Sequence, residues 1–175
     1  MSAMTEESVI KDFYEWTEDD LRTNLPAGNY HLKVTKASAG EWDDGRPRLD
    51  IQTEILSGEH VGMYGPRHTW NSGEFSGTAN AGTDSERKFT ITAEQNAKLL
   101  VRNMQAIHQG ELTISNPGLY NKAMFEEIAP QLVDDEFIAS VKTNRKGYDT
   151  IGRFFSVSEP PDGFMTDGEL AEWSL

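Results

Sequence analysis

Apolar and polar side chains alternate in GNYHLKVTK (residues 28–36) and again in LDIQTEI (residues 49–55). A period of two residues is typical of a β-strand with one buried face. The segment between them, residues 38–47, is rich in Gly, Asp and Pro, which favour turns over strand pairing. We therefore predict two antiparallel strands joined by a hairpin loop, and this loop carries Trp42 and Arg46.

The chain beyond the second strand is less regular. A third strand is predicted at residues 63–70, where Gly65 and Pro66 indicate a bulge or an edge position. Residues 71–85 contain many Gly, Ser, Thr and Asn residues and one large apolar side chain, Phe75. Because so polar a segment buries little apolar surface, we expect a long mobile loop there.

Two helices are predicted after this loop. The first spans residues 92–109, because Thr92 and Gln95 fit a capping box and apolar residues follow at spacings of three and four. The second spans residues 117–128, and Pro130 is expected to stop it.

The alternating pattern returns at residues 137–143 and 148–157, which a turn at residues 144–147 separates. Three strands, a helical insertion and a two-stranded hairpin follow one another in this order in the OB-fold. We therefore predict a mainly β chain, folded as an OB-like five-stranded Greek-key barrel with a helix between strands three and four.

Charge divides the chain into a body and two acidic ends. The 175 residues carry a formal net charge of -13, of which residues 1–24 contribute -5 and residues 154–175 another -5. The remaining -3 on residues 25–153 leaves the body nearly balanced, so its composition allows a local basic groove. We predict an acidic N-terminal extension, one domain at residues 25–157 and an acidic flexible tail at residues 158–175.

Composition also excludes several kinds of site. The chain has no cysteine, which rules out disulfides, thiolate catalysis and cysteine-ligated zinc. Its four histidines are scattered, and it contains no HExxH motif, Gly-x-Ser-x-Gly elbow or phosphate-binding loop. We therefore expect no enzymatic activity, no metal and no cofactor. The sequence has no run of about 18 apolar residues, so we expect no membrane partner and a cytoplasmic location.

Part of the chain resembles a known family. The run LPAGNY at residues 25–30 leads into an alternating strand, a turn and a second strand that ends near a bend at residues 57–62. Together with the helix at residues 92–109 and the strands within residues 137–155, this order resembles small phage OB-fold proteins that bind single-stranded DNA and are encoded beside recombination and replication genes. The resemblance implies sequence-independent binding of single-stranded DNA in phage replication or recombination, in the host cell cytoplasm.

Single strands are bound by a positive groove that follows the backbone and by aromatic rings on which bases stack. Three segments of this chain combine basic and aromatic residues: the first hairpin loop, the third strand and the turn between the last two strands. The candidate DNA-binding residues are Trp42, Arg46, Arg48, Arg67, His68, Trp70, Lys142, Arg145, Lys146 and Tyr148. We expect closure of the barrel to bring the three segments to one side.

Plainer interpretations of these residues stay open. Trp42 could cover a barrel end, and Trp70 suits a core position because large aromatic side chains are mostly buried. The basic turn could be a solvated hairpin tip. Asp50 and Glu54 would point outward from the second strand, which leaves open whether its outer face or only the loops touch DNA.

Acidic and apolar residues are mixed at the end of the chain, from residue 162 to residue 175. In kind, this composition resembles the acidic, hydrophobic tips with which bacterial single-stranded DNA-binding proteins recruit replication and repair partners, so we expect phage or host recombination or replication proteins as partners of this tail. We take Phe164, Trp173 and Leu175 as candidate partner-binding residues. The alternative is a terminal segment that packs on its own barrel.

Two other classes of protein compete with the DNA-binding interpretation. An acidic phage protein could mimic DNA and inhibit a host nucleic-acid-binding protein. A virion protein could use a similar β-barrel as a structural unit. The sequence leaves the oligomeric state open, and it also leaves open whether Phe13 and Trp16 lie on an N-terminal helix.

Overall fold

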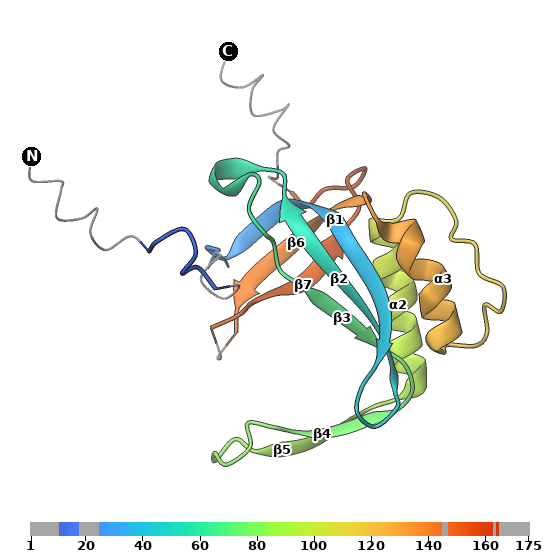
Figure 1. The fold of residues 1–175 in the computed structure, drawn as a ribbon. Helices are drawn as coiled ribbons and strands as arrows, with labels where there is room; N and C mark the ends of the chain where they lie inside the picture. The colour runs from blue at the N-terminus through green and yellow to red at the C-terminus, as the bar shows by residue number, and fades with distance from the viewer. Residues whose placement is uncertain (1–10, 18–24, 145–146, 163, 165–175) are drawn as a thin grey trace, which may run out of the picture.

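Five strands form one antiparallel sheet in the order β3-β2-β1-β6-β7, and two further strands form a separate hairpin. The computed structural model describes residues 11–17, 25–144, 147–162 and 164 (Figure 1). The elements of the described chain are β1 (Gly28–Glu41), β2 (Pro47–Ile55), the 3-10 helix η1 (Gly58–His60), β3 (His68–Asn71), β4 (Phe75–Ala79), β5 (Arg87–Ile91), α2 (Ala93–Ile107), α3 (Lys122–Leu132), β6 (Glu136–Thr143) and β7 (Asp149–Phe155). The prediction of a mainly β chain that also contains helices is confirmed.

β1 is the central strand and is longer than the predicted strand at residues 28–36. Its first part pairs with β6, and its pairing with β2 continues to Glu41 opposite Pro47. A register shift between Val34 and Lys36 interrupts the ladder, and such bulges bend a strand. Much of the predicted turn therefore belongs to β1, because pairing with β2 outweighs the weak strand propensity of its Ser and Gly residues.

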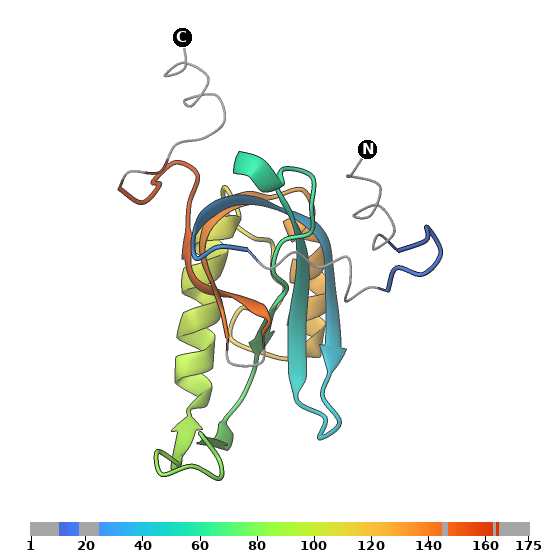
Figure 2. The same cartoon turned by 90° about the vertical axis from the view of Figure 1, so that its left-hand side faces the viewer.

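The main core lies between the curved sheet and the two helices, which cover the same side of it (Figures 1 and 2). Leu32 and Val34 of β1 and Leu49 and Ile51 of β2 are at most 1% exposed, as their alternation predicts. α3 packs against β1 and β2, while α2 lies near β3, β6 and β7. The helices contribute Leu100, Met104, Ile107, Met124, Phe125, Ile128, Ala129 and Leu132 to this core.

The predicted capping box is present at the start of α2. The Thr92 hydroxyl accepts a hydrogen bond from the backbone N–H of Gln95 at 3.1 Å, and the Gln95 side chain accepts one from the N–H of Thr92 at 2.8 Å. α2 ends at Ile107, within the predicted range. Along the described ranges of the chain, no helix combines the length and the apolar character needed to cross a membrane.

α3 differs from its prediction at both ends. It begins at Lys122, where the side chain of the N-cap Asn121 accepts a hydrogen bond from the N–H of Met124. It ends at Leu132, so Pro130 lies inside the helix and does not stop it. Proline removes one backbone hydrogen bond. The burial of neighbouring Leu132 in the core offsets that loss near the end of the helix.

Aromatic side chains fill the space between the two edge strands of the sheet, which forms a nearly closed barrel. The ring of Phe154 on β7 lies 4.9 Å from the ring of His68 and 5.6 Å from that of Trp70, both on β3. It also stacks on Phe137 of β6 at 5.3 Å. β3 and β7 are therefore joined by side-chain packing, and burial of these rings stabilises the closed shape.

β4 and β5 form an arm at residues 75–91, where the sequence predicted a mobile loop. In both views the arm extends away from the body of the molecule (Figures 1 and 2). Phe75 and Phe89 face each other across it with ring centroids 6.0 Å apart. The prediction was wrong because it counted Phe75 alone, and the strand that carries Phe89 lies beyond the segment taken as the loop.

Candidate nucleic-acid interface

The first hairpin loop meets the end of β3 and the base of the arm in a group of five residues, which we call the loop cluster. Its members are Trp42, Arg46, Arg48, Asn71 and Phe75. Three of them, Trp42, Arg46 and Arg48, are residues that the sequence predicted for the site. Backbone hydrogen bonds between Trp42 and Arg46 and between Gly45 and Trp42 close the loop, and Gly45 has a positive φ of 85° that suits glycine.

Trp42 lies on the outer surface of the sheet and is 37% exposed. Its indole N–H donates a 2.7 Å hydrogen bond to the side-chain oxygen of Asn71 at the end of β3. The guanidinium of Arg48 lies 4.8 Å from the centre of the indole ring. The Arg48 side chain also lies close to Gly40: a Cβ added to Gly40 would stand 3.2 Å from Arg48 Nε. Trp42 is thus held in place by polar and cation–π contacts, outside the main core.

Both arginines of the loop cluster have acidic neighbours. Arg46 binds Asp44 through a 2.6 Å contact, and hydrogen bonds from the backbone and side chain of Arg46 lower the pKa of that carboxyl group. Arg48 Nε lies 3.1 Å from a carboxylate oxygen of Asp50. The two groups form an ion pair, but their geometry is not that of a hydrogen bond. The cluster is therefore close to neutral. A phosphate can bind Arg46 or Arg48 closely only by replacing the paired carboxylate, and exposed ion pairs of this kind are weak.

The outer face of β1 and β2 is less acidic than the sequence suggested. Asp50 and Glu54 do point outward, because they alternate with buried residues along β2. However, Lys33 stands opposite Glu54 in the register of β1 and β2, and Lys36 stands opposite Gln52. These lysines were not among the predicted site residues, because the sequence pattern marked β1 only by its buried side chains.

Tyr64 is a further residue that the sequence reasoning missed. It lies beside Glu54 in an isolated bridge to β2 and is 59% exposed. The predicted third strand included this position, but Gly65 and Pro66 break the strand, and regular pairing begins only at His68. Because the register was uncertain across this break, no signal in the sequence showed that Tyr64 faces outward while Trp70 faces inward.

His68 and Trp70 do not lie on the candidate interface. Trp70 is 1% exposed and packs on His68 with ring centroids 4.6 Å apart. Burial lowers the pKa of His68 to about 4, so its imidazole is uncharged at neutral pH. We therefore remove both from the set of DNA-binding candidates. Arg67, the residue before them, is exposed and remains in the set.

The turn between β6 and β7 forms a second candidate surface. Lys142 is exposed at the end of β6 and Tyr148 is 47% exposed, whereas Arg145 and Lys146 lie outside the described residues. The N–H of Tyr148 donates a 3.0 Å hydrogen bond to the side chain of Asn144, which orders the turn.

The structure places the two hairpin loops at opposite ends of β1. Val141, near the β6–β7 turn, stands opposite Gly28, whereas the first loop follows Glu41. The expectation that barrel closure gathers all three segments is not met within the described chain. A single strand that touches both loops must follow the length of β1.

The candidate partner-binding residues lie at the edge of the described chain. Phe164 is half-buried, and its N–H donates a hydrogen bond to the carbonyl of Pro161 at 3.1 Å. Trp173 and Leu175 lie outside the described residues. In the N-terminal segment, Phe13 and Trp16 are exposed, and residues 11–17 form a turn without a helix.

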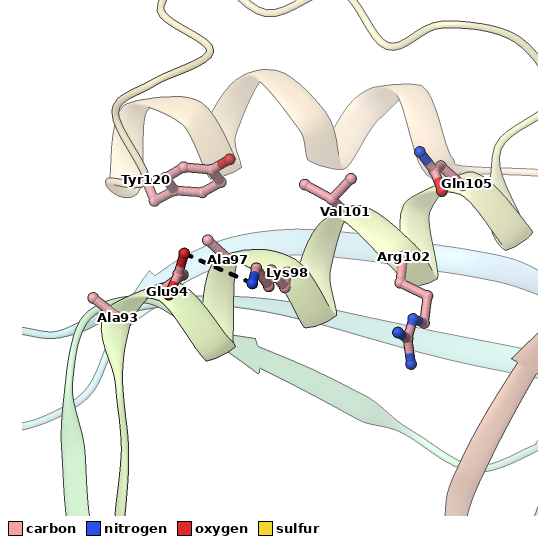
Figure 3. A pocket seen from close by; sticks show the side chains of 8 residues that line it. All are labelled: Ala93, Glu94, Ala97, Lys98, Val101, Arg102, Gln105 and Tyr120. Atoms are coloured by element: carbon pink, nitrogen blue, oxygen red, sulfur yellow. Dashed lines mark ion pairs between the residues drawn. The ribbon is translucent and has the colours of Figure 1, made fainter.

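A groove between α2 and the start of α3 contains none of the predicted site residues (Figure 3). Ala97, Val101 and Tyr120 line it, with charged side chains at its rim. Glu94 and Lys98 pair across 3.7 Å there. Because the rim carries both signs of charge, the groove does not form a basic channel for a phosphate backbone.

Comparison with known proteins gives no further assignment. No protein-family model matches the chain, and no curated protein matches it. Within the described ranges, no group of three or more His, Asp or Glu side chains is arranged to hold a metal ion. The interpretation of the site therefore depends on its own geometry.

Proposed function

We propose that this chain binds single-stranded DNA without base specificity, as an OB-like protein of phage replication or recombination. The observation that carries the proposal is the loop cluster. An exposed tryptophan is held there by the guanidinium of Arg48 and by a hydrogen bond to Asn71, on the outside of a barrel-like sheet, as a base-stacking residue requires. OB-folds commonly bind oligonucleotides at the loop between their first two strands, which is where this cluster lies.

The topology supports the same proposal. The sheet order β3-β2-β1-β6-β7 fits an OB-like Greek-key barrel that lacks backbone pairing between its third and fifth strands. The helices lie in the chain between β3 and β6, the third and fourth strands of that sheet. The resemblance of residues 25–70, 92–109 and 137–155 to phage single-stranded DNA-binding proteins points in the same direction.

Replacement of Trp42 tests the proposal. We expect Trp42→Ala to weaken binding to labelled oligo-dT by about 1 to 3 kcal/mol, the range for loss of one base stack. Trp42→Phe keeps an aromatic face and loses the hydrogen bond to Asn71, so it serves as the matched control and should keep most of the affinity. Unchanged affinity in Trp42→Ala, with an unchanged melting temperature, would contradict the proposal.

The main rival explanation is an acidic interaction protein that mimics DNA. It predicts binding to a basic nucleic-acid-binding protein and none to oligonucleotides. The pairing of Arg46 and Arg48 with carboxylates makes this comparison necessary. A pull-down with such a protein, run beside the oligo-dT titration, separates the two.

A further inference from the structure

The arm has one face that is aromatic and one that is polar. In the β4–β5 register, Phe75, Gly77 and Phe89 fall on the first face, because Gly77 stands opposite Phe89 and side chains alternate along each strand. Ser76 and Thr90 are paired on the other face, with their hydroxyl oxygens 2.9 Å apart. Both rings are half-buried, and no helix or strand of the body packs closely on the arm within the described chain.

Gly77 is what allows the two rings to lie over the arm. A Cβ added there would stand 2.9 Å from the ring of Phe89 and 3.3 Å from that of Phe75. The first of these separations is shorter than carbon atoms tolerate. The rings therefore rest on bare backbone, and each keeps an accessible surface.

The arm is joined to the loop cluster by a cation–π contact. The guanidinium of Arg46 lies 4.5 Å from the centre of the Phe75 ring. On its other side Arg46 is bonded through the loop backbone to Trp42. The loop backbone and the Arg46–Phe75 contact thus connect Trp42, on the outer face of the sheet, to the rings of the arm.

The charges of the arm balance, because Asp84 and Glu86 near its turn stand against Arg87 and Lys88 on β5. Arg87 stands opposite Ala79 on the same face as the two rings and is exposed, whereas Lys88 stands opposite Thr78 on the polar face. An apolar partner, such as a second copy of the arm, would bury Arg87 beside the two rings and Ile91, which stands opposite Phe75. Stable protein interfaces bury well over 1,000 Å² in total, more than so small an arm offers by itself. Stacked bases and a phosphate use the two rings and the single cation on this face of the arm.

We propose that the arm is a second part of the single-stranded DNA interface, in which bases stack on Phe75 and Phe89 and a phosphate contacts Arg87. This inference depends on the proposed function. It assigns the direction in which the strand leaves the loop cluster, along the arm and away from the β6–β7 turn. A bound strand must then exceed a certain length before it reaches Phe89.

A length series of oligo-dT tests this inference in the full chain. We expect Phe89→Ala to bind the shortest oligomers as the wild type does and to bind dT30 about 5- to 150-fold more weakly, as expected for loss of one stack. Thr90→Ala is the matched control. It removes the hydroxyl contact on the opposite face and leaves the rings in place, so it should bind dT30 as the wild type does.

A second measurement does not depend on how well a variant folds. Oligo-dT containing 5-iododeoxyuridine is irradiated with the wild-type chain, and mass spectrometry locates the cross-links. We expect adducts on Phe75 or Phe89 as well as on Trp42.

The possible failures can be told apart. Wild-type binding with no arm adducts, or equal loss in Phe89→Ala and Thr90→Ala, would overturn the role of the arm and leave the proposed function standing. Absence of any binding by the wild type would overturn both. A change from dimer to monomer in Phe89→Ala, with DNA affinity unchanged, would assign the arm to a second copy instead.

Discussion

His68 shows how one residue can connect core packing to the pH dependence of stability. Its ring lies between Trp70 and Phe154, and burial lowers its pKa to about 4. In the unfolded chain the same group titrates near 6.5. The unfolded state therefore binds more protons between these two values, and the folded state loses stability as the pH falls through that range.

We predict that the free energy of unfolding falls between pH 7 and pH 4, with a contribution from His68 of roughly 3 kcal/mol. His68→Phe removes the titrating group and keeps an aromatic ring at this position. Urea unfolding at several pH values should show the variant gaining stability relative to the wild type as the pH falls. Burial raises the pKa of Asp135, which acts in the opposite sense in both proteins and cancels in the comparison. Parallel pH profiles would contradict this account.

At the scale of single residues, sequence reasoning succeeded where the strand pattern was regular. Trp42 and Arg46 were assigned to a loop between two clear strands, and the structure places them there. The inward orientation of His68 and Trp70 could not be predicted, because Gly65 and Pro66 interrupt the period-two pattern that sets the register. Tyr64 was missed for the same reason.

At the scale of elements, the arm depends on the absence of a side chain at Gly77, where an added Cβ would stand 2.9 Å from the ring of Phe89. We predict that Gly77→Val disorders the arm. Overpacking lowers the stability of a folded element by about 1 to 3 kcal/mol, and an isolated two-stranded hairpin is only marginally stable. Hydrogen exchange should show lost protection at residues 75–91. The body should keep its protection and melting temperature, since no other element packs closely on the arm within the described chain. Equal loss of protection in β1 and β2 would show that the arm is part of the main cooperative unit.

Elements with strong local signals were predictable from the sequence, and elements that depend on distant partners were not. The capping box at Thr92 located the start of α2 because both hydrogen bonds form within one turn. The arm was missed because Phe75 needs Phe89, which lies across the turn. Pro130 was expected to end α3, yet burial of Leu132 in the core extends the helix beyond it.

At the scale of the whole molecule, charge is unevenly distributed. Residues 154–175 carry -5, while the body at residues 25–153 carries only -3. An acidic segment tethered to the body is at high effective concentration near its basic side chains and competes with phosphates for them. We predict that deletion of residues 162–175 raises the affinity for oligo-dT, more at low salt than at high salt, because salt screens the competing charges.

The same deletion tests the proposed recruiting role of the tail. Capture of a recombination or replication partner should be lost, with Trp173 and Leu175 as the anchors. If the tail instead packs on the barrel, deletion lowers the melting temperature and leaves DNA affinity unimproved. Measuring both quantities on one truncated chain distinguishes the two accounts.

The most direct test of the central claim is a titration of the full chain into labelled oligo-dT and into duplex DNA of equal length at matched salt. The account predicts clear preference for the single strand, because the stacking rings of the loop cluster need unpaired bases. It also predicts a shallow salt dependence, with a logarithmic slope of about -0.7 for each neutralised phosphate and few such contacts, because Arg46 and Arg48 already have carboxylate neighbours. Equal affinity for the duplex, or no binding to either DNA, would contradict it.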